Sequence, residues 1–200
     1  MGERCRRTAS PQHCARRHVM ASEFQRDKLR AMFEAFDADG NGYLEEADFA
    51  ALAVRWGRLP RVRAESGLAA RVENVMRGWW RQLSAAVDAD ADGRIDMDDL
   101  LRMVDLLPTV PEAVTATADT VFDAIDENGD GRISRDEHRH LIDTWHGRAV
   151  ETGDVFDRLD QDGDGYLDRP EFAVLWTQFW TSDDPREPGN LMCGELPHGR

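Results

Sequence analysis

Residues 160–171 read DQDGDGYLDRPE, with acids at positions 1, 3 and 5, glycine at 6, leucine at 8 and an acid at 12. The same twelve-residue pattern recurs at 37–48 (DADGNGYLEEAD), 88–99 (DADADGRIDMDD) and 126–137 (DENGDGRISRDE). In all four stretches position 1 is Asp, positions 3 and 5 are Asp or Asn, position 6 is Gly, position 8 is Leu or Ile, and position 12 is Asp or Glu. Four copies with the same internal pattern indicate a repeat rather than acidic turns that arose by chance.

This spacing matches the EF-hand calcium loop. Calcium takes roughly six to eight oxygen ligands, and short side chains at positions 1, 3 and 5 of a curled loop converge on one point. Position 7 adds a backbone carbonyl, position 9 usually acts through water, and position 12 closes the shell from the next helix. The predicted metal ligands are Asp37, Asp39, Asn41, Tyr43 and Asp48; Asp88, Asp90, Asp92, Arg94 and Asp99; Asp126, Asn128, Asp130, Arg132 and Glu137; and Asp160, Asp162, Asp164, Tyr166 and Glu171.

The residues around the loops predict the fold. Position 8 is apolar in every loop, and we expect short β-bridges there that pair the first loop with the second and the third with the fourth. Apolar residues at helical spacing flank each loop. The predicted helices cover 22–36, 46–57, about 64–87, 97–107, 112–125, 135–146, 149–159 and 169–181, with Gly57 and Pro60 ending the second. The predicted fold is all-α, with four EF-hands in two paired lobes packed compactly.

The chain divides into four parts by composition: a basic leader at 1–20, an N-terminal EF-hand pair at 21–107, a C-terminal pair at 108–181, and a Pro- and Gly-rich tail at 182–200. For the leader we expect Met20 to be the true first residue; the alternative is a disordered arm or transit-like peptide. Pro108 and Pro111 are expected to break the chain between the pairs. Two interpretations of the tail stay open: it folds back with Leu191 and Met192 in the core, or it is disordered.

Charge and composition exclude several classes of protein. The formal net charge of −14 argues against a nucleic-acid partner, which needs clustered cations. No apolar run approaches the roughly 18–20 residues of a membrane helix. Three cysteines, Cys5, Cys14 and Cys193, make a poor disulfide framework, so we expect reduced thiols in a cytoplasmic protein. The expected partners are calcium ions, the expected state is a monomer, and no protein target is indicated.

Position 12 differs between the two halves of the chain. Glu137 and Glu171 are long enough to bind bidentately, which suits calcium. Asp48 and Asp99 are one methylene shorter, which favours magnesium relative to calcium. The hypothesis is therefore two tight calcium sites in the C-terminal half and two weaker or magnesium-tolerant sites in the N-terminal half. The alternative is four equal calcium sites.

Over roughly residues 22–181 the chain resembles calerythrin and the sarcoplasmic calcium-binding proteins. The resemblance rests on the first loop, which ends at Asp48, and on the aromatic pair Trp79–Trp80. This pair lies on the long helix expected between the first and second loops, which are widely spaced in the sequence. The resemblance implies a compact molecule, with both lobes around a shared apolar interior, that buffers or transports calcium. The second loop is often degraded in that family; here it keeps every ligand position.

Three functions compete: a calcium buffer, a calcium sensor that binds a partner helix, and a carrier of a small organic ligand. Met32, Met76, Met97 and Met103 lie in the first half and none falls between 104 and 191, so a Met-lined sensor groove in both lobes is not expected. The buffer is favoured and the sensor is the runner-up. No nucleophile–base arrangement or phosphate loop is present, so we predict no enzyme.

The aromatic and histidine residues help to judge whether the protein carries a small organic ligand. We expect the six tryptophans to fill the core between the lobes rather than line a ligand cavity; they are Trp56, Trp79, Trp80, Trp145, Trp176 and Trp180. The two tyrosines both occupy position 7 of a loop, which argues against the light-emitting EF-hand photoproteins. His138, His140 and His146 do not share one helical face, so we expect them to be solvent-exposed rather than metal-binding.

Overall fold

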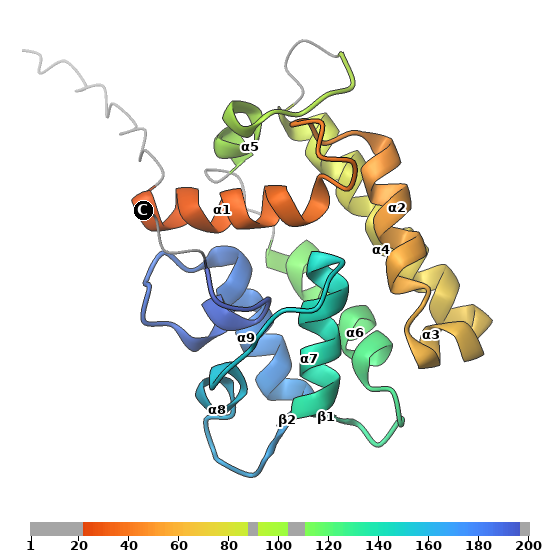
Figure 1. Cartoon of the computed structure of the whole chain (residues 1–200), viewed down its shortest axis with the longest axis vertical. Helices are drawn as coiled ribbons and strands as arrows, with labels where there is room; N and C mark the ends of the chain where they lie inside the picture. Colours follow the sequence, from red (N-terminus) through yellow and green to blue (C-terminus); the bar gives the residue numbers. More distant parts are fainter. Residues whose placement is uncertain (1–21, 88–91, 104–110, 197–200) are drawn as a thin grey trace, which may run out of the picture.

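The computed structural model describes residues 22–87, 92–103 and 111–196, and its regular elements are mostly helices (Figure 1). The elements are α1 (Glu23–Phe36), α2 (Glu46–Trp56), α3 (Pro60–Ala64), α4 (Ser66–Val87), α5 (Met97–Met103), α6 (Pro111–Ile125), β1 (Arg132–Ser134), α7 (Arg135–His146), α8 (Val155–Leu159), β2 (Tyr166–Asp168), α9 (Arg169–Thr181) and the 3₁₀ helix η2 (Pro188–Leu191). The leader at 1–20 and the expected break at Pro108 lie outside the described residues.

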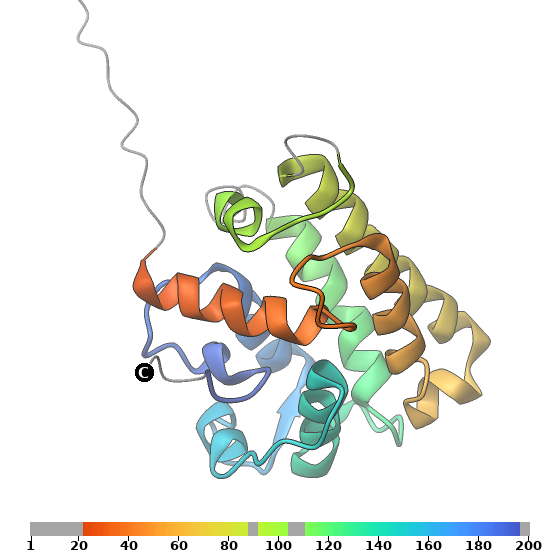
Figure 2. The ribbon, with the colours of Figure 1, turned by 45° about the horizontal axis from the view of Figure 1, so that its top comes forward.

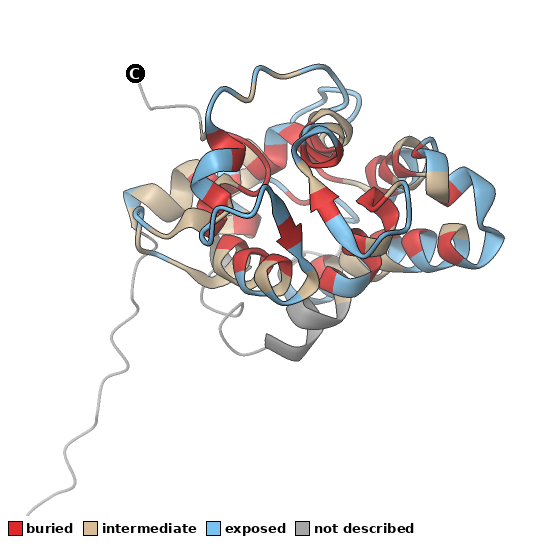
Figure 3. Cartoon of the chain, turned by 90° about the horizontal axis from the view of Figure 1, so that it is seen from below, coloured by how far each residue is buried: buried red, intermediate tan, exposed pale blue. Residues whose placement is uncertain are grey.

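The loops pair back to back, as the apolar residues at position 8 predict. β1 and β2 run antiparallel with Ile133 opposite Leu167. In the first pair Leu44 and Ile95 form an isolated bridge, with N···O distances of 2.9 and 3.1 Å. All four side chains are fully buried, and Figure 3 shows buried residues on both strands. The prediction of paired EF-hands joined by short β-bridges is therefore confirmed.

The two halves share one aromatic core. Trp79 of α4 stacks on Phe36, with ring centroids 5.8 Å apart, and meets Trp145, Trp176 and Trp180 of the C-terminal half at 6.3, 6.4 and 5.8 Å. In both ribbon views α1 runs between α5 and the C-terminal half, and it contacts α5 and α7 (Figures 1 and 2). As expected, tryptophans fill the space between the lobes, and the lobes pack compactly.

Arginines of the N-terminal half cross to the C-terminal half. Nη1 of Arg55 in α2 donates to the carbonyl of Trp145 at 3.0 Å. Nη2 of Arg71 in α4 lies 2.8 Å from Oδ2 of Asp123 in α6. Helices α3 and α4 also contact α6 directly. Packing between the halves is thus supported by charge-assisted contacts around the aromatic core.

Helix boundaries differ from the prediction at two places. Pro60 was predicted to end the second helix, and in the structure it is also the first residue of α3. A proline is tolerated there because the first helical residue makes no intrahelical N–H bond. The helix expected at 149–159 is shortened to α8, because Gly153 and Asp154 form a turn in which Gly153 has φ +46° and the N–H of Val155 donates to the carbonyl of Thr152 at 2.9 Å. The other boundaries lie within one or two residues of prediction, except that 104–107 fall outside the described residues.

The position of the tail decides between its two predicted conformations and also determines the burial of His138. The tail folds back: Met192 is fully buried and Leu191 packs against the core. His138 was expected to be exposed, and this is wrong, because the tail covers it and leaves 1 % of its surface accessible. The Cys193 thiol is free and buried. Among the described residues, no helix is long and apolar enough to cross a membrane.

Candidate metal centre

The first residue of each described loop shapes the loop around its own carboxylate. One oxygen accepts from the backbone N–H of the position 6 glycine: Asp37 from Gly42 at 2.9 Å, Asp126 from Gly131 at 3.1 Å and Asp160 from Gly165 at 2.9 Å. These glycines have φ between +82° and +87°, a conformation that a side chain penalises. The aspartate and the glycine together curl the chain so that the following side chains point inward.

Positions 3 and 5 extend this arrangement. Each accepts a hydrogen bond from the backbone N–H two residues later, a turn that Asp and Asn favour. The position 3 distances are 3.1 Å for Asp39, 2.8 Å for Asn128 and 3.1 Å for Asp162. At position 5 they are 2.8 Å for Asn41, 2.8 Å for Asp92, 2.9 Å for Asp130 and 2.9 Å for Asp164. Two of these acids also accept from the Asn side chain at the other of these two positions: Oδ2 of Asp39 accepts from Nδ2 of Asn41 at 3.1 Å, and Oδ2 of Asp130 accepts from Nδ2 of Asn128 at 3.0 Å. A carboxylate oxygen has more than one lone pair, so such a bond does not prevent it from binding a cation.

Position 12 joins the loop to the helix that leaves it. In the third loop Glu137 accepts from the backbone N–H of Glu127 at 2.9 Å and of Ser134 at 2.8 Å. In the first loop Asp48 makes the equivalent pair, to Ala38 at 3.0 Å and Glu45 at 2.8 Å. The shorter acid therefore reaches the same loop positions, and burial raises its pKa above the ordinary value.

In the fourth loop the closing acid is less engaged. Glu171 accepts from the N–H of Asp168, the N-cap of α9, at 2.9 Å and so completes the capping box of that helix. Burial, opposed by that bond, raises its pKa. Oxygens of Asp160, Asp162 and Asp164 lie within 4.8 Å of one another, as do oxygens of Asp37, Asp39 and Asp48 in the first loop. Two ligands on opposite sides of calcium are about 4.6–5.2 Å apart, so both oxygen sets suit this ion.

The second loop is described only in part, since Asp88 and Asp90 lie outside the described residues. Asp92 makes its turn to Arg94, and Asp99 accepts from the N–H of Asp96 at 3.3 Å. Gly93 has φ +77°, like the other position 6 glycines. The second half of this loop therefore has the same local geometry as the others.

Position 7 side chains of paired loops contact each other across each lobe. The Arg94 guanidinium lies 5.4 Å from the ring centroid of Tyr43, and that of Arg132 lies 5.3 Å from Tyr166. Nε of Arg94 also lies 2.8 Å from an oxygen of Glu45 at position 9 of the first loop. For these residues the sequence predicted only that the backbone carbonyl binds the metal. The Arg–Tyr contact could have been predicted from the sequence, because position 7 is Tyr in one loop of each pair and Arg in the other.

A cation from the other half approaches the third loop, which sequence reasoning missed. Nη1 of Arg61 in α3 lies 3.0 Å from both the backbone oxygen and Oδ2 of Asp126, the first residue of that loop. The Asp126 side chain is 3 % exposed. Glu65, one helical turn after Arg61, bonds Nε of the same guanidinium at 2.9 Å and is the main reason why the pKa of Arg61 is raised.

Comparison with known proteins agrees with this geometry. The model of the EF-hand domain pair family matches residues 26–105 and 115–177, more than half of the chain. Repeated carboxylate loops between helices define the chain as an EF-hand calcium-binding protein, and it belongs to the EF-hand domain pair family.

The chain is also similar to individual calcium-binding proteins. The chain is 33 % identical over 112 residues to the sarcoplasmic calcium-binding protein alpha chain of Penaeus vannamei, covering 52 % of this chain and 58 % of that protein. The match thus spans little more than half of the relative's length. The sarcoplasmic calcium-binding protein of amphioxus shares the fold with a TM-score of 0.69 at 18 % identity, covering 88 % of this chain and all of the other. A calcium-binding protein of Streptomyces coelicolor gives 0.62 at 23 %, covering 80 % and 98 %.

Proposed function

We propose that this protein is a calcium buffer of the sarcoplasmic calcium-binding type, a cytoplasmic monomer that takes up ions without presenting a surface to a target. Its ligands are the side chains at positions 1, 3, 5 and 12 and the backbone carbonyl at position 7 of the four loops. Calcium supplies the charge that these converging carboxylates lack. The loops orient the oxygens through their own backbone hydrogen bonds, and the following helices hold position 12.

The observation that carries the buffer proposal is the burial of the apolar helix faces against each other. A sensor must expose an apolar groove when it binds calcium. Here Phe36, Trp79, Trp145 and Trp176 of the two halves pack ring against ring. Among the described residues, the exposed large apolar side chains are only Tyr43, Val54, Tyr166 and Val174, and the tyrosines belong to loops.

The first and second loops are proposed to tolerate magnesium. Asp48 and Asp99 end these loops, and an aspartate carboxylate supports a smaller shell than a bidentate glutamate. The Asp48 carboxylate accepts from two backbone N–H groups just as Glu137 does, so the proposed difference rests on the length of the side chain. The third and fourth loops, closed by Glu137 and Glu171, are proposed to be the tight calcium sites.

Calorimetric titration of the metal-free protein with calcium tests this function. We expect four ions, two of which bind more weakly and lose heat of binding when millimolar magnesium is present. A hydrophobic dye in the same titration should show little calcium-dependent increase. Absence of calcium uptake at millimolar concentration contradicts calcium binding itself, whereas a large dye increase would identify a sensor. Four equal sites that ignore magnesium refute the proposed selectivity alone.

A carrier of a small organic molecule is the second candidate, and one atom favours it. Nε1 of Trp180 is buried and has no hydrogen-bond partner among residues 22–87, 92–103 and 111–196. A buried donor without an acceptor is unfavourable, and a ligand oxygen would satisfy it. Tryptophan fluorescence of the purified protein before and after organic extraction tests this candidate. An unchanged spectrum and no extracted compound would exclude a co-purifying ligand.

A further inference from the structure

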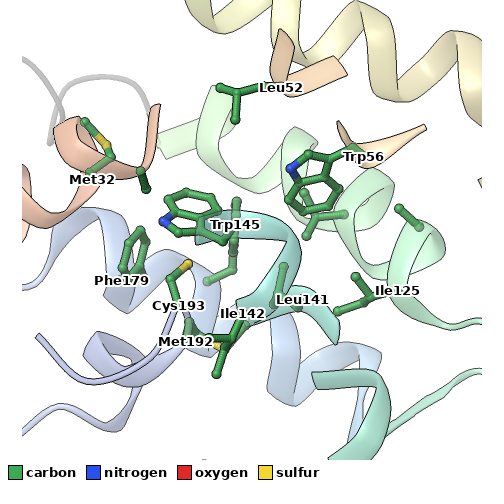
Figure 4. Close-up of a cluster of buried hydrophobic side chains, with 14 of the residues drawn as sticks. Met32, Leu52, Trp56, Ile125, Leu141, Ile142, Trp145, Phe179, Met192 and Cys193 are labelled. Atoms are coloured by element: carbon green, nitrogen blue, oxygen red, sulfur yellow. The ribbon is translucent and has the colours of Figure 1, made fainter. Parts of the chain in front are cut away.

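The end of the described chain lies inside the C-terminal half. Helix η2 packs against α9 and α8, and the next residues, Met192 to Gly194, are buried. Figure 4 draws Met192 and Cys193 in one cluster of buried side chains with Ile142, Trp145 and Phe179. The segment therefore completes the apolar core of the third and fourth EF-hands.

Two histidines of α7 bind the backbone of this segment. Nε2 of His138 lies 3.0 Å from the carbonyl oxygen of Met192, and Nε2 of His146 lies 2.8 Å from that of Cys193. A carbonyl only accepts, so each imidazole carries its proton on Nε2. Both nitrogens thus donate to consecutive carbonyls, which holds the segment along α7 whatever side chains it carries.

Residues before Met192 fit the other wall, α9. The N–H of Gly189 donates to Oε1 of Gln178 at 3.0 Å. A Cβ on Gly189 would lie 2.3 Å from the carbonyl oxygen of Leu175, so only glycine fits this close backbone approach. Oδ1 of Asn190, which is 3 % exposed, accepts from Nζ of Lys28 in α1 at 2.8 Å. Contacts to α1, α7, α8 and α9 therefore surround one short segment.

The connection to this segment has no regular structure, although the Ser182 carbonyl accepts from Nζ of Lys28 at 3.0 Å and the Asp184 carbonyl accepts from Nδ2 of Asn190 at 2.9 Å. Residues 182–187 contain no helix or strand, and Asp183, Pro185 and Arg186 are exposed. Residues 182–187 join the segment to α9 without regular structure, so it can leave its position without unwinding α9. A segment that is joined to the fold by irregular chain can open locally before the rest unfolds, even where several helices contact it.

We propose that residues 188–194 are an intramolecular ligand that fills the target groove of the C-terminal EF-hand pair and thereby keeps this half in the closed, buffering form. Sensor EF-hand pairs bind an external amphipathic segment in such a groove. Here Met192 supplies the only methionine side chain of the C-terminal half, and it comes from the occupant rather than from a helix. The inference rests on the proposed buffer function, because it names what prevents this half from acting as a sensor.

Cys193 provides a direct measure of the docked segment in the full chain. Substituting Cys5→Ser and Cys14→Ser leaves Cys193 as the single thiol. Burial raises its pKa, so a thiol reagent labels it only after the segment opens. In calcium, we expect labelling to be far slower than for a free thiol, yet faster than global unfolding allows and nearly independent of low denaturant. Labelling that requires global unfolding would overturn the proposal.

Met192→Ala in the same background tests the anchor. Loss of a buried methionine side chain should raise the labelling rate on the order of 30-fold. The matched control is Leu196→Ala, two residues beyond the docked segment and half-buried, where we expect less than about a threefold change. If Met192→Ala increases global unfolding by the same factor as labelling, the segment belongs to the cooperative core and is not a ligand. If that variant does not fold, the single-thiol protein alone decides.

A peptide of residues 184–196 tests the groove itself. We expect calcium-loaded Met192→Ala protein to bind this labelled peptide and a hydrophobic dye, and wild-type protein to bind neither. Calcium uptake by all variants is measured by titration in parallel. A dye-silent Met192→Ala protein with rapid Cys193 labelling would refute the groove while leaving the buffer intact; a wild-type protein that binds dye on adding calcium would refute the buffer.

Discussion

Removing the guanidinium that faces the third loop should strengthen calcium binding there. Arg61 is the cation that lies 3.0 Å from Oδ2 of Asp126, and it comes from the other half of the molecule. In Arg61→Gln the buried Asp126 carboxylate loses its ion-pair partner in the metal-free protein. Calcium would replace that partner in the loaded protein. The substitution therefore destabilises the metal-free state more than the loaded state, and linkage converts this difference into affinity.

The magnitude follows from the geometry. Two unit charges about 4 Å apart at an effective dielectric constant of about 20 interact by about 4 kcal/mol. The Arg61 side chain is 23 % exposed and is shared with Glu65, so solvent and the second acid reduce this value. We expect the metal-free protein to lose about 2 kcal/mol of unfolding free energy and the loaded protein about 1 kcal/mol or less. Calcium affinity of the third loop should rise about fivefold to tenfold.

Calorimetric titration and chemical denaturation, with and without calcium, measure both quantities. Arg71→Gln is the matched control, because Arg71 also reaches from the N-terminal half to α6, yet its partner Asp123 is not a proposed ligand. That variant should leave calcium affinity unchanged. If Arg61→Gln binds calcium as weakly as wild type or more weakly, Arg61 orients the loop rather than competing with the ion, and the reasoning fails.

Three further predictions concern the charge of Lys28, the length of the side chain that closes the first loop, and the aromatic core. Burial lowers the pKa of Lys28, the only lysine, to about 8, so above pH 8 the folded state releases a proton that the unfolded state keeps. The unfolding free energy should rise by about 2 kcal/mol from pH 8 to 10, and Lys28→Met should lack this increment in denaturation experiments. Asp48→Glu should raise calcium affinity at the first loop on the order of tenfold and weaken magnesium competition, as titration would show. Trp176→Ala should lower the unfolding free energy by about 3–5 kcal/mol without changing the number of calcium ions bound.

Each of these predictions has an opposing result. Parallel pH profiles of wild type and Lys28→Met would mean that burial does not lower the pKa of Lys28. Undiminished magnesium competition in Asp48→Glu would assign the selectivity to another residue. A small stability loss in Trp176→Ala, whose ring packs 6.2 Å from Trp145 and 6.4 Å from Trp79, would contradict a shared core.

Much of the fold could be predicted because the interactions that produce it are short in sequence. In the third loop Asp126 binds the N–H of Gly131, five residues later, and Glu137 binds that of Glu127, ten residues earlier. Loop pairing also followed from sequence, since Ile133 and Leu167 are apolar at the one position that faces the partner loop. Helix ends were less certain, because Pro60 can end one helix or begin another.

What the amino-acid sequence alone determined is the repeated loop, its paired arrangement and hence the class of protein, because each loop carries its own turn residues and oxygens. Only the tertiary structure decided that Arg61 meets Asp126, 65 residues away, and that the tail covers His138, 54 residues away. Those contacts depend on how the two lobes and the tail pack on the aromatic core. Packing of this kind depends on shape and burial among distant side chains, and no local spacing in the chain encodes it.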